Sequence, residues 1–243
     1  FRDSAHAYSN DTILAFTNLG NVYKFTARFI EQCKLNGKGT QLSQICKCEA
    51  HEQIVNIFNL AETNVANDLF FFTRDGFIRK CPFSEFDIAK SSASAIKLKL
   101  GDEVIRVQDN LYMPSAVCVT KNGMVLNCEL GSVPSQKRGA SGVIGIQLSQ
   151  GDEVVFAGQV MSSDKLIVLT DNNHIKRVNM TEIPMSARNR KGLQICVAKE
   201  KVDFAIAPVV SGEFVAVFKS GAVEVVDVSK IDVLPRNKTG KPM

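Results

Sequence analysis

Residues 68–81 read DLFFFTRDGFIRKC: an apolar run, a short polar turn, and a second run in which apolar and polar residues alternate. Such alternation is the pattern of a β-strand with one buried face, and Asp-Gly between two such runs is typical of a hairpin. We therefore expect an antiparallel hairpin here. Asp75-Gly76 favours a type I′ turn, because both central residues of that turn need a positive φ.

The same pattern recurs along the chain. It is found at 12–25 (TILAFTNLGNVYKF), 116–128 (AVCVTKNGMVLNC), 165–178 (KLIVLTDNNHIKRV) and 214–226 (FVAVFKSGAVEVV). The turn residues Gly20, Gly76, Gly123, Asn173 and Gly221 are 56, 47, 50 and 48 residues apart. Asn is a suitable replacement for Gly, because it tolerates the left-handed region best among the other residues. A fixed period of this length indicates a repeat architecture.

A second shared segment follows each of the first four hairpins, at 37–55, 90–105, 138–155 and 190–206. In these segments Glu52, Glu103 and Glu153 recur about fifty residues apart. Each repeat thus supplies about four short strands, the content of one propeller blade. We predict an all-β, propeller-like domain of about five four-stranded blades of about 50 residues. It covers residues 1–243 as a single cooperative domain without a linker.

Composition limits the class of protein. Of the 243 residues 45% are hydrophobic, enough for a core, and no apolar run approaches the roughly 18 residues of a membrane span. The first residues lack the pattern of a signal peptide, and the missing initial Met suggests a fragment of a longer chain. Seven cysteines among apolar neighbours are typical of free thiols in a reducing cytoplasm. We expect a soluble cytoplasmic protein that does not bind a membrane.

Catalytic and metal-binding patterns are weak. The three histidines have no nucleophile or carboxylate at a recognisable spacing, and the repeated Gly-Asp-Glu is explained as an acidic turn between strands. Cys46 and Cys48 would share one face of a strand near His51, but the neighbourhood offers no fourth zinc ligand. We interpret both thiols as core residues and expect no catalytic residue, metal or cofactor in this domain.

Basic residues recur in phase with the repeat, in two sets. The first lies in the second strand of the hairpins: Lys24, Arg79, Lys80, Lys176 and Arg177. The second lies in the loop after each hairpin: Lys34, Lys38, Lys90, Lys137, Arg138, Arg188, Arg190, Lys191, Arg236 and Lys238. Equivalent elements of a propeller lie at equivalent heights and radii, so we expect a basic band. Such a band suits the phosphates of a duplex bent around a rim.

Two other functions are compatible with a propeller repeat. A protein-interaction propeller explains the repeat and remains the alternative, but it lacks the W-D signature and gives no reason for phased basic loops. A propeller enzyme would need polar or metal-binding residues on its inner strands. The inner candidates here are apolar, such as ILAF at 13–16 and LIVL at 166–169.

The stretches 13–25, 70–86, 138–155 and 175–195 together resemble the repeats of one family, and the resemblance covers essentially the whole chain. The family is the C-terminal domain of the A subunit of bacterial type IIA topoisomerases, DNA gyrase and topoisomerase IV. The resemblance implies a β-pinwheel whose blades exchange strands and whose basic perimeter binds and bends double-stranded DNA. It also implies a nucleoid-associated enzyme in the bacterial cytoplasm, with a second A subunit and a B subunit, in which ATP and Mg are used elsewhere.

Gyrase subunits of this family carry a box, Q-R-R-G-G-K-G, needed for wrapping DNA and introducing negative supercoils. Residues Gln136 to Gly142 match its length, its Gln, its basic pair and two of its glycines, which adds Gln136 to the expected DNA contacts. Ser141 removes one phosphate partner, and Ala140 is expected to remove backbone freedom at positive φ. The loop should therefore hold DNA less tightly than a full box. The segment SARNRKGLQI at 186–195 is more similar to topoisomerase IV of Gram-positive type, which the sequence favours over gyrase.

Overall fold

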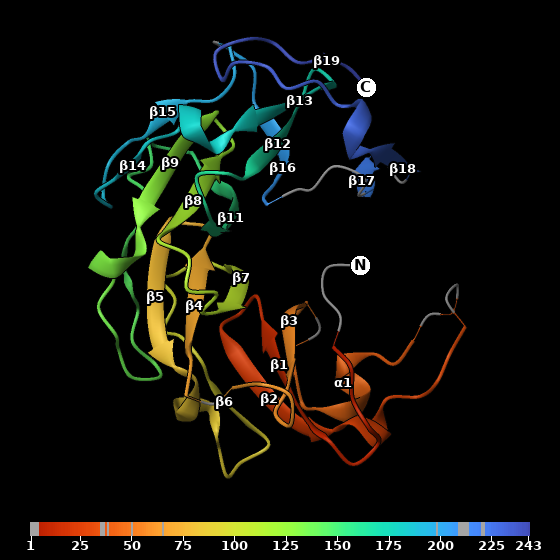
Figure 1. Ribbon diagram of the computed structural model, residues 1–243. Helices are drawn as coiled ribbons and strands as arrows, with labels where there is room; N and C mark the ends of the chain where they lie inside the picture. The colour runs from red at the N-terminus through yellow and green to blue at the C-terminus, as the bar shows by residue number, and fades with distance from the viewer. Residues whose placement is uncertain are drawn as a thin grey trace. The chain divides into compact units, whose positions relative to one another are not determined.

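A computed structural model describes residues 5–34, 37, 39–49, 51–64, 66–197, 199–208, 214–219 and 222–243. Within these residues the chain forms β-strands, short 3-10 turns and one four-residue α-helix, α1 (Leu42–Ile45) (Figure 1). The prediction of an all-β chain is confirmed. The contacts divide the chain into two compact parts. The first part comprises 1–73, 78–110 and 134–143, and the second comprises 74–77, 111–133 and 144–243.

Each of the first four hairpins forms the centre of one mainly antiparallel sheet, although Met185 pairs in parallel with Asn127 in the third. The first sheet has the order β3-β1-β2-β6, formed by β1 (Thr12–Thr17), β2 (Asn21–Thr26), β3 (Ile54–Asn59) and β6 (Ser92–Ser94). The second has the order β10-β5-β4-β7, formed by β4 (Asp68–Thr73), β5 (Phe77–Pro82), β7 (Val104–Asp109) and β10 (Val143–Ile144).

The remaining sheets follow the same plan. The third has the order β11-β8-β9-β14, formed by β8 (Ser115–Thr120), β9 (Met124–Glu129), β11 (Val154–Val160) and β14 (Met185–Ser186), and β15 (Leu193–Gln194) also pairs with β9. The fourth has the order β16-β12-β13-β19, formed by β12 (Lys165–Thr170), β13 (His174–Asn179), β16 (Val202–Ile206) and β19 (Lys241–Pro242). The fifth hairpin, β17 (Phe214–Lys219) and β18 (Ala222–Asp227), forms a two-stranded sheet within the described residues.

The outer strand of each four-stranded sheet comes from the following repeat. Strand β6 follows the second hairpin but pairs with β2 of the first, with Asn21 opposite Ser94. Strand β19 follows the fifth hairpin but pairs with β13 of the fourth, and Figure 1 shows the blue β19 beside the teal β13. A strand of the following repeat therefore completes each of these sheets, and the strand exchange implied by the family resemblance is confirmed. The exchange satisfies the N–H and C=O groups along the outer edge of each hairpin, which would otherwise lack partners.

The hairpin turns differ from the predicted type. Gly20, Gly123 and Asn173 have positive φ of 78°, 79° and 63°, but Asp75 and Asn122 do not. The N–H of the left-handed residue donates to the carbonyl three residues earlier, at 3.0 Å for Gly123 and Thr120. Each is therefore a type I turn followed by one left-handed residue, a three-residue hairpin loop instead of type I′. Gly221, the predicted turn residue of the fifth repeat, lies outside the described residues.

Phenylalanine fills the core of the first part. Phe16 of β1 packs edge-on against Phe58, Phe71 and Phe86, with ring centroids 5.7, 5.6 and 5.0 Å apart. Edge-to-face contacts of this kind add about 0.5–1.5 kcal/mol to what burial of the rings contributes. The second part has an aliphatic core around Val117, Leu166 and Val168. The predicted inner strands are thus buried, and the polar loops are carried on a packed scaffold.

The acidic turns are structural. The strand register shows which acids are equivalent: Glu52, Asp102, Asp152 and Glu200. Each lies two residues before the first residue that pairs with a hairpin strand. The equivalent of Glu52 in the second repeat is therefore Asp102 and not Glu103, as the sequence spacing had indicated. Asp152 Oδ1 accepts the main-chain N–H of Asn122 in the neighbouring hairpin turn at 2.9 Å. Glu52 and Asp152 thus satisfy donors of the hairpins, the structural role expected for an acidic turn between strands.

Candidate nucleic-acid interface

Three basic loops lie directly on the second strand of the preceding hairpin. They span 137–142, 187–192 and 235–240, and each leads into an exchanged strand or a segment equivalent to one. Gly142 has φ +86°, and a Cβ there would lie 2.7 Å from the carbonyl oxygen of Ile78. A Cβ on Gly240 would lie 2.6 Å from the carbonyl oxygen of Ile175. Only glycine allows so close an approach, so the position four residues after Arg138 or Arg236 fixes where the loop is seated.

The structure sorts the predicted DNA contacts by exposure. Seven of them are exposed: Lys34, Lys90, Lys137, Arg138, Arg190, Lys191 and Lys238. Five are half-buried: Lys24, Lys80, Gln136, Arg188 and Arg236. Lys38 lies outside the described residues. The exposed set falls mainly in the loops, where side chains can reach a phosphate without rearrangement of the core.

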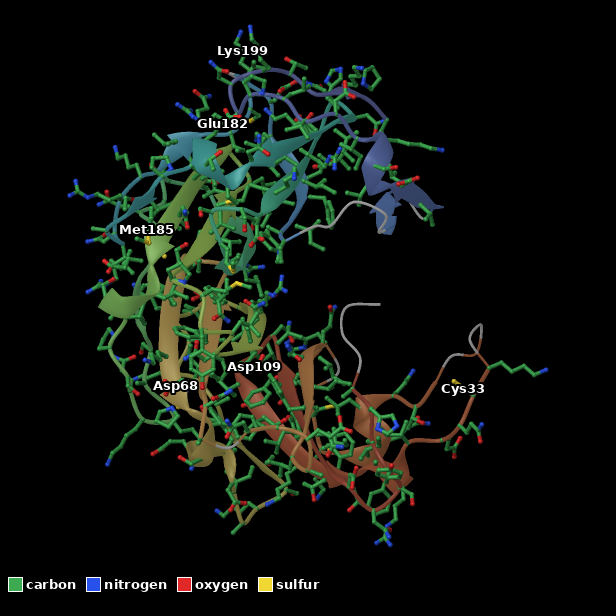
Figure 2. The ribbon with its side chains drawn as sticks, in the orientation of Figure 1. Cys33, Asp68, Asp109, Glu182, Met185 and Lys199 are labelled. Atoms are coloured by element: carbon green, nitrogen blue, oxygen red, sulfur yellow. The ribbon has the colours of Figure 1, made fainter. Side chains whose placement is uncertain are left out.

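The half-buried members of the hairpin set are paired with acids. Lys24 Nζ lies 3.2 Å from Asp87 Oδ1, and Lys80 Nζ lies 3.2 Å from Asp68 Oδ2. Asp68 is labelled at the start of β4 in Figure 2. An incoming phosphate would have to compete with these carboxylates.

The half-buried arginines of the loops contact main-chain carbonyls. Arg188 donates to the carbonyls of Ser132 and Ile144, both at 3.4 Å, and Arg236 donates to that of Gln194 at 2.9 Å. Their positive charge is not neutralised by these contacts, because a carbonyl carries only a partial charge. It therefore still contributes to the potential of the loops.

Three predicted contacts are corrected, because Arg79, Lys176 and Arg177 lie inside the protein with 0%, 2% and 9% of their surface exposed. Arg79 Nη1 donates to the carbonyls of Ala95 and Ala140, and its guanidinium carbon lies 4.5 Å from the centroid of the Phe71 ring. Burial lowers the pKa of Arg79 and of Lys176.

Lys176 Nζ donates to the carbonyls of Arg236 and Lys238 at 2.7 and 2.5 Å, and Arg177 Nε donates to that of Ile231 at 2.7 Å. A buried charge needs such partners, and these cations satisfy loop carbonyls instead of phosphates.

A signal in the sequence could have shown this. Arg79 and Lys176 are the third residue after the turn residue, where the first and third repeats have Tyr23 and Leu126. Tyr23 and Leu126 are buried, with 5% and 4% exposed. Strand alternation puts all of these positions on one face, so a large apolar residue at two of them indicates that the face points inward.

Two acids that the sequence analysis did not single out contact the loops. Glu85, in the 3-10 turn η2 (Phe83–Phe86), accepts the main-chain N–H of Arg138 at 3.1 Å. Glu182, in the 3-10 turn η4 (Met180–Glu182), accepts the main-chain N–H of Arg236 at 3.0 Å. The sequence contained one signal for these two acids, because each occupies the same position in its repeat, directly after Ser84 or Thr181 and just beyond a hairpin.

The expectation for Ala140 is also corrected. In the box-like loop Gly139 and Gly142 have positive φ of 85° and 86°, but Ala140 does not. A glycine at position 140 would therefore relieve no strain. Of the two departures from the gyrase box, only Ser141, an exposed residue, changes the side-chain chemistry that the loop presents to solvent.

Cys46 and Cys48 lie after α1 outside any strand, and both are half-buried, so the interpretation as core strand residues is wrong. Burial raises the pKa of both thiols. Among the described residues no group of three or more His, Cys, Asp or Glu side chains is placed to hold a metal ion. The part of the chain that the structure describes contains no helix of the length and apolarity needed to cross a membrane.

Comparison with known proteins agrees with this architecture. The family model described as "DNA gyrase C-terminal domain, beta-propeller" matches residues 11–45, 67–108, 115–161 and 164–211. The fold is similar to that of the C-terminal domain of DNA topoisomerase IV, with a TM-score of 0.89, 21% identity, and coverage of 97% of this chain and 75% of that chain.

Curated relatives include both enzymes. The DNA gyrase A subunit of Escherichia coli is 25% identical over 238 residues, which are 96% of this chain and 27% of that protein. The DNA topoisomerase 4 A subunit of Staphylococcus epidermidis is 26% identical over 194 residues, which are 77% of this chain and 24% of that protein. The chain thus spans about a quarter of the length of these relatives. It belongs to the DNA gyrase C-terminal domain family, the β-propeller domain of type IIA topoisomerase A subunits.

Proposed function

We propose that this chain is a non-catalytic domain that binds duplex DNA and bends or wraps it for strand passage by a type IIA topoisomerase. The observation that supports this most directly is the repeated basic loop. Arg138, Arg190 and Lys191 are exposed on loops whose glycines rest on the preceding hairpin. Exposed positive charge on loops whose backbone is already fixed is what phosphate contacts need, and such contacts carry little sequence information.

The salt dependence of binding tests the proposal. If about 6 to 10 phosphates are contacted, affinity for a plain duplex falls by about 10³ to 10⁵ between 50 and 200 mM salt. The triple variant Lys137→Gln, Arg138→Gln, Arg190→Gln should reduce the slope of log K against log salt by about 2.7, because each lost phosphate contact contributes about 0.9. All three side chains are exposed, so thermal unfolding should change little.

A matched control removes the same charge elsewhere. Lys199, Lys201 and Lys230 are exposed and lie outside the three loops. Their replacement by Gln should change the slope much less. Equal effects of the two triple variants would mean that net charge, and not the loops, attracts DNA. If the wild-type protein does not bind duplex DNA even at low salt, the alternative function, a protein-interaction propeller, is favoured.

In the whole enzyme, we propose, this domain works with a second A subunit and a B subunit on nucleoid DNA in the bacterial cytoplasm, and ATP and Mg act outside it. The departures from the gyrase box support topoisomerase IV over gyrase. The holoenzyme should then relax or decatenate plasmid DNA with ATP without introducing negative supercoils. Negative supercoiling of relaxed plasmid by a holoenzyme with no other intact box would contradict this assignment.

A further inference from the structure

Two of the three basic loops are held by a carboxylate at the main-chain N–H of their arginine. Glu85 accepts from Arg138 at 3.1 Å in the first part of the chain, and Glu182 accepts from Arg236 at 3.0 Å in the second. Both acids lie in the 3-10 turn after a hairpin, and Figure 2 shows Glu182 on the segment that follows β13. A hydrogen bond from an N–H to a carboxylate is about twice as strong as one between neutral groups.

The same two loops are held at their carbonyls by a buried cation. Arg79 donates to the carbonyl of Ala140, two residues after Arg138, at 3.3 Å. Lys176 donates to the carbonyls of Arg236 and Lys238 at 2.7 and 2.5 Å. Arg79 and Lys176 are the third residue after their turn residues, so the arrangement repeats with the fold. We call each cation with its acid, Arg79 with Glu85 and Lys176 with Glu182, a clasp.

The two members of a clasp also act on each other. Burial lowers the pKa of Arg79, and the negative charge of Glu85 opposes that shift. Burial lowers the pKa of Lys176 as well, and Glu182 is among the acids that oppose it. Each clasp therefore brings a negative and a positive charge to one stretch of loop backbone, the first at an N–H and the second at a carbonyl.

The loop of the third sheet is built without a clasp. Leu126 occupies the position of the cation and Ser132 the position of the acid. The loop uses its own Arg188, which donates to the Ser132 carbonyl at 3.4 Å. The chain thus contains an internal comparison: two loops fixed by buried and half-buried charges, and one equivalent loop fixed by other means.

We propose that Glu85 and Glu182, together with Arg79 and Lys176, are positioning residues that hold two basic loops in their DNA-binding conformation before DNA arrives. This inference rests on the proposed function for the identity of the ligand. Fixing the backbone of one residue costs about 1–2 kcal/mol, and a clasp meets that cost during folding instead of during binding. The acids have a second, opposing effect, because their negative charge repels an approaching phosphate.

Substitution by Gln and by Ala separates the two effects. In Glu85→Gln and Glu182→Gln the amide oxygen still accepts the N–H but the repelling charge is gone, so affinity for a plain duplex should rise about twofold to fivefold. In Glu85→Ala and Glu182→Ala the charge is equally removed but the acceptor is lost, so affinity should lie about fivefold below that of the matching Gln variant, the equivalent of one hydrogen bond, and no higher than that of the wild type. The variants are made in the full-length subunit, and binding is measured at one fixed salt concentration.

Ser132→Ala is the matched control, because it changes the equivalent position, where the loop contact is made by the main-chain carbonyl and not by the side chain. It should leave affinity unchanged. Ala variants that bind as tightly as the Gln variants would overturn the proposal, since the acids would then only repel DNA. Should an Ala variant unfold, Glu85→Asp or Glu182→Asp replaces it, because the shorter side chain withdraws the acceptor and keeps the charge.

A measurement without DNA separates this inference from the proposed function. Amide hydrogen exchange should show the N–H groups of Arg138 and Arg236 protected in the wild type and in the Gln variants. Protection should fall at least tenfold in the Ala variants and stay unchanged in Ser132→Ala. If the wild type fails to bind DNA, the proposed function fails, and the exchange rates still decide whether the clasps hold the loops. Unchanged exchange in the Ala variants would overturn the clasp even if DNA binds.

Discussion

The hydroxyl of Tyr23 donates to Oε2 of Glu52 at 2.8 Å, between the second strand of the first hairpin and the turn that precedes β3. Thr17 Oγ1 and Asn21 Nδ2 donate to the other carboxylate oxygen of Glu52. Only 9% of the Glu52 surface is exposed. One acid therefore collects donors from both strands of a hairpin and fixes the third strand against it.

Glu52 should make the stability of the protein dependent on acid pH. Burial alone would raise the pKa of Glu52, but the hydrogen bonds from Thr17, Asn21 and Tyr23 outweigh it and lower that pKa below its usual value. The folded state then gains stability from this group above the unfolded-state pKa, about 4.3, and loses it as the pH falls through the lower folded-state value. Glu52→Gln should reduce the free energy of unfolding by about 1–2 kcal/mol at pH 7. Denaturant titrations at pH 7 and pH 3 should show a smaller difference for Glu52→Gln than for wild type.

Alanine at Gly142 should destabilise the protein more than alanine at Gly139. Both residues have positive φ, 86° and 85°, so both substitutions strain the backbone by about 1 kcal/mol. A Cβ at Gly142 would also lie 2.7 Å from the Ile78 carbonyl oxygen, whereas one at Gly139 would have nothing within 4 Å. We expect an additional loss of about 1–3 kcal/mol for Gly142→Ala in thermal or denaturant unfolding. Equal losses would mean that the loop does not rest on β5.

Ser141→Lys should strengthen DNA binding, whereas Ala140→Gly alone should not. Ser141 is exposed in the box-like loop, so a lysine there adds one phosphate contact and makes the salt slope steeper by about 0.9. Ala140 does not have a positive φ, so glycine at this position only increases the freedom of the unfolded chain. The check is the affinity for plain duplex at several salt concentrations. Stronger binding by Ala140→Gly would show that flexibility, and not charge, limits this loop.

The chain should unfold in a single cooperative transition. Its contacts group into two compact parts, but the chain passes between them after residues 73, 77, 110, 133 and 143. Neither part is one continuous segment, so neither can unfold without pulling on the other. Calorimetry should give equal calorimetric and van't Hoff enthalpies. Two separate transitions would contradict the prediction that residues 1–243 fold as one block.

The hairpins were predictable because their signals are local. Gly20, Gly123 and Asn173 mark the left-handed position of the turn, and the flanking alternation sets which face is buried. The exact turn type was not predictable from the sequence, because Asn122-Gly123 fits both a type I′ turn and a type I turn followed by one left-handed residue. Strand exchange came only from the family resemblance. Periodicity shows that β6 is a strand but does not tell which hairpin edge it covers.

The exposure of the loop residues was predictable from the recurring charges, whereas the burial of Arg79 required a comparison with Tyr23 and Leu126 at the same position of other repeats. Arg138 and Arg79 both recur in phase with the repeat, and the recurrence of a charge does not by itself tell whether that charge faces water or a carbonyl. Whether a basic side chain is exposed or buried depends on where the loop of the following repeat packs, which is a tertiary contact. The same holds for Glu85, whose role depends on a main-chain N–H that is 53 residues away in sequence.

Strand exchange also determines when, during synthesis of the chain, each hairpin gains the strand that completes its sheet. In the described residues the outer edge of β2 pairs with β6, about seventy residues later, and that of β13 pairs with β19 after a similar interval. At about 5–20 residues per second, a hairpin emerging from the ribosome waits roughly 4 to 14 s for the strand that completes its sheet. Until then the unpaired N–H and C=O groups of its outer strand can pair with another nascent chain. Each repeat is therefore protected from edge-to-edge aggregation only after the next repeat has been translated and has supplied its strand.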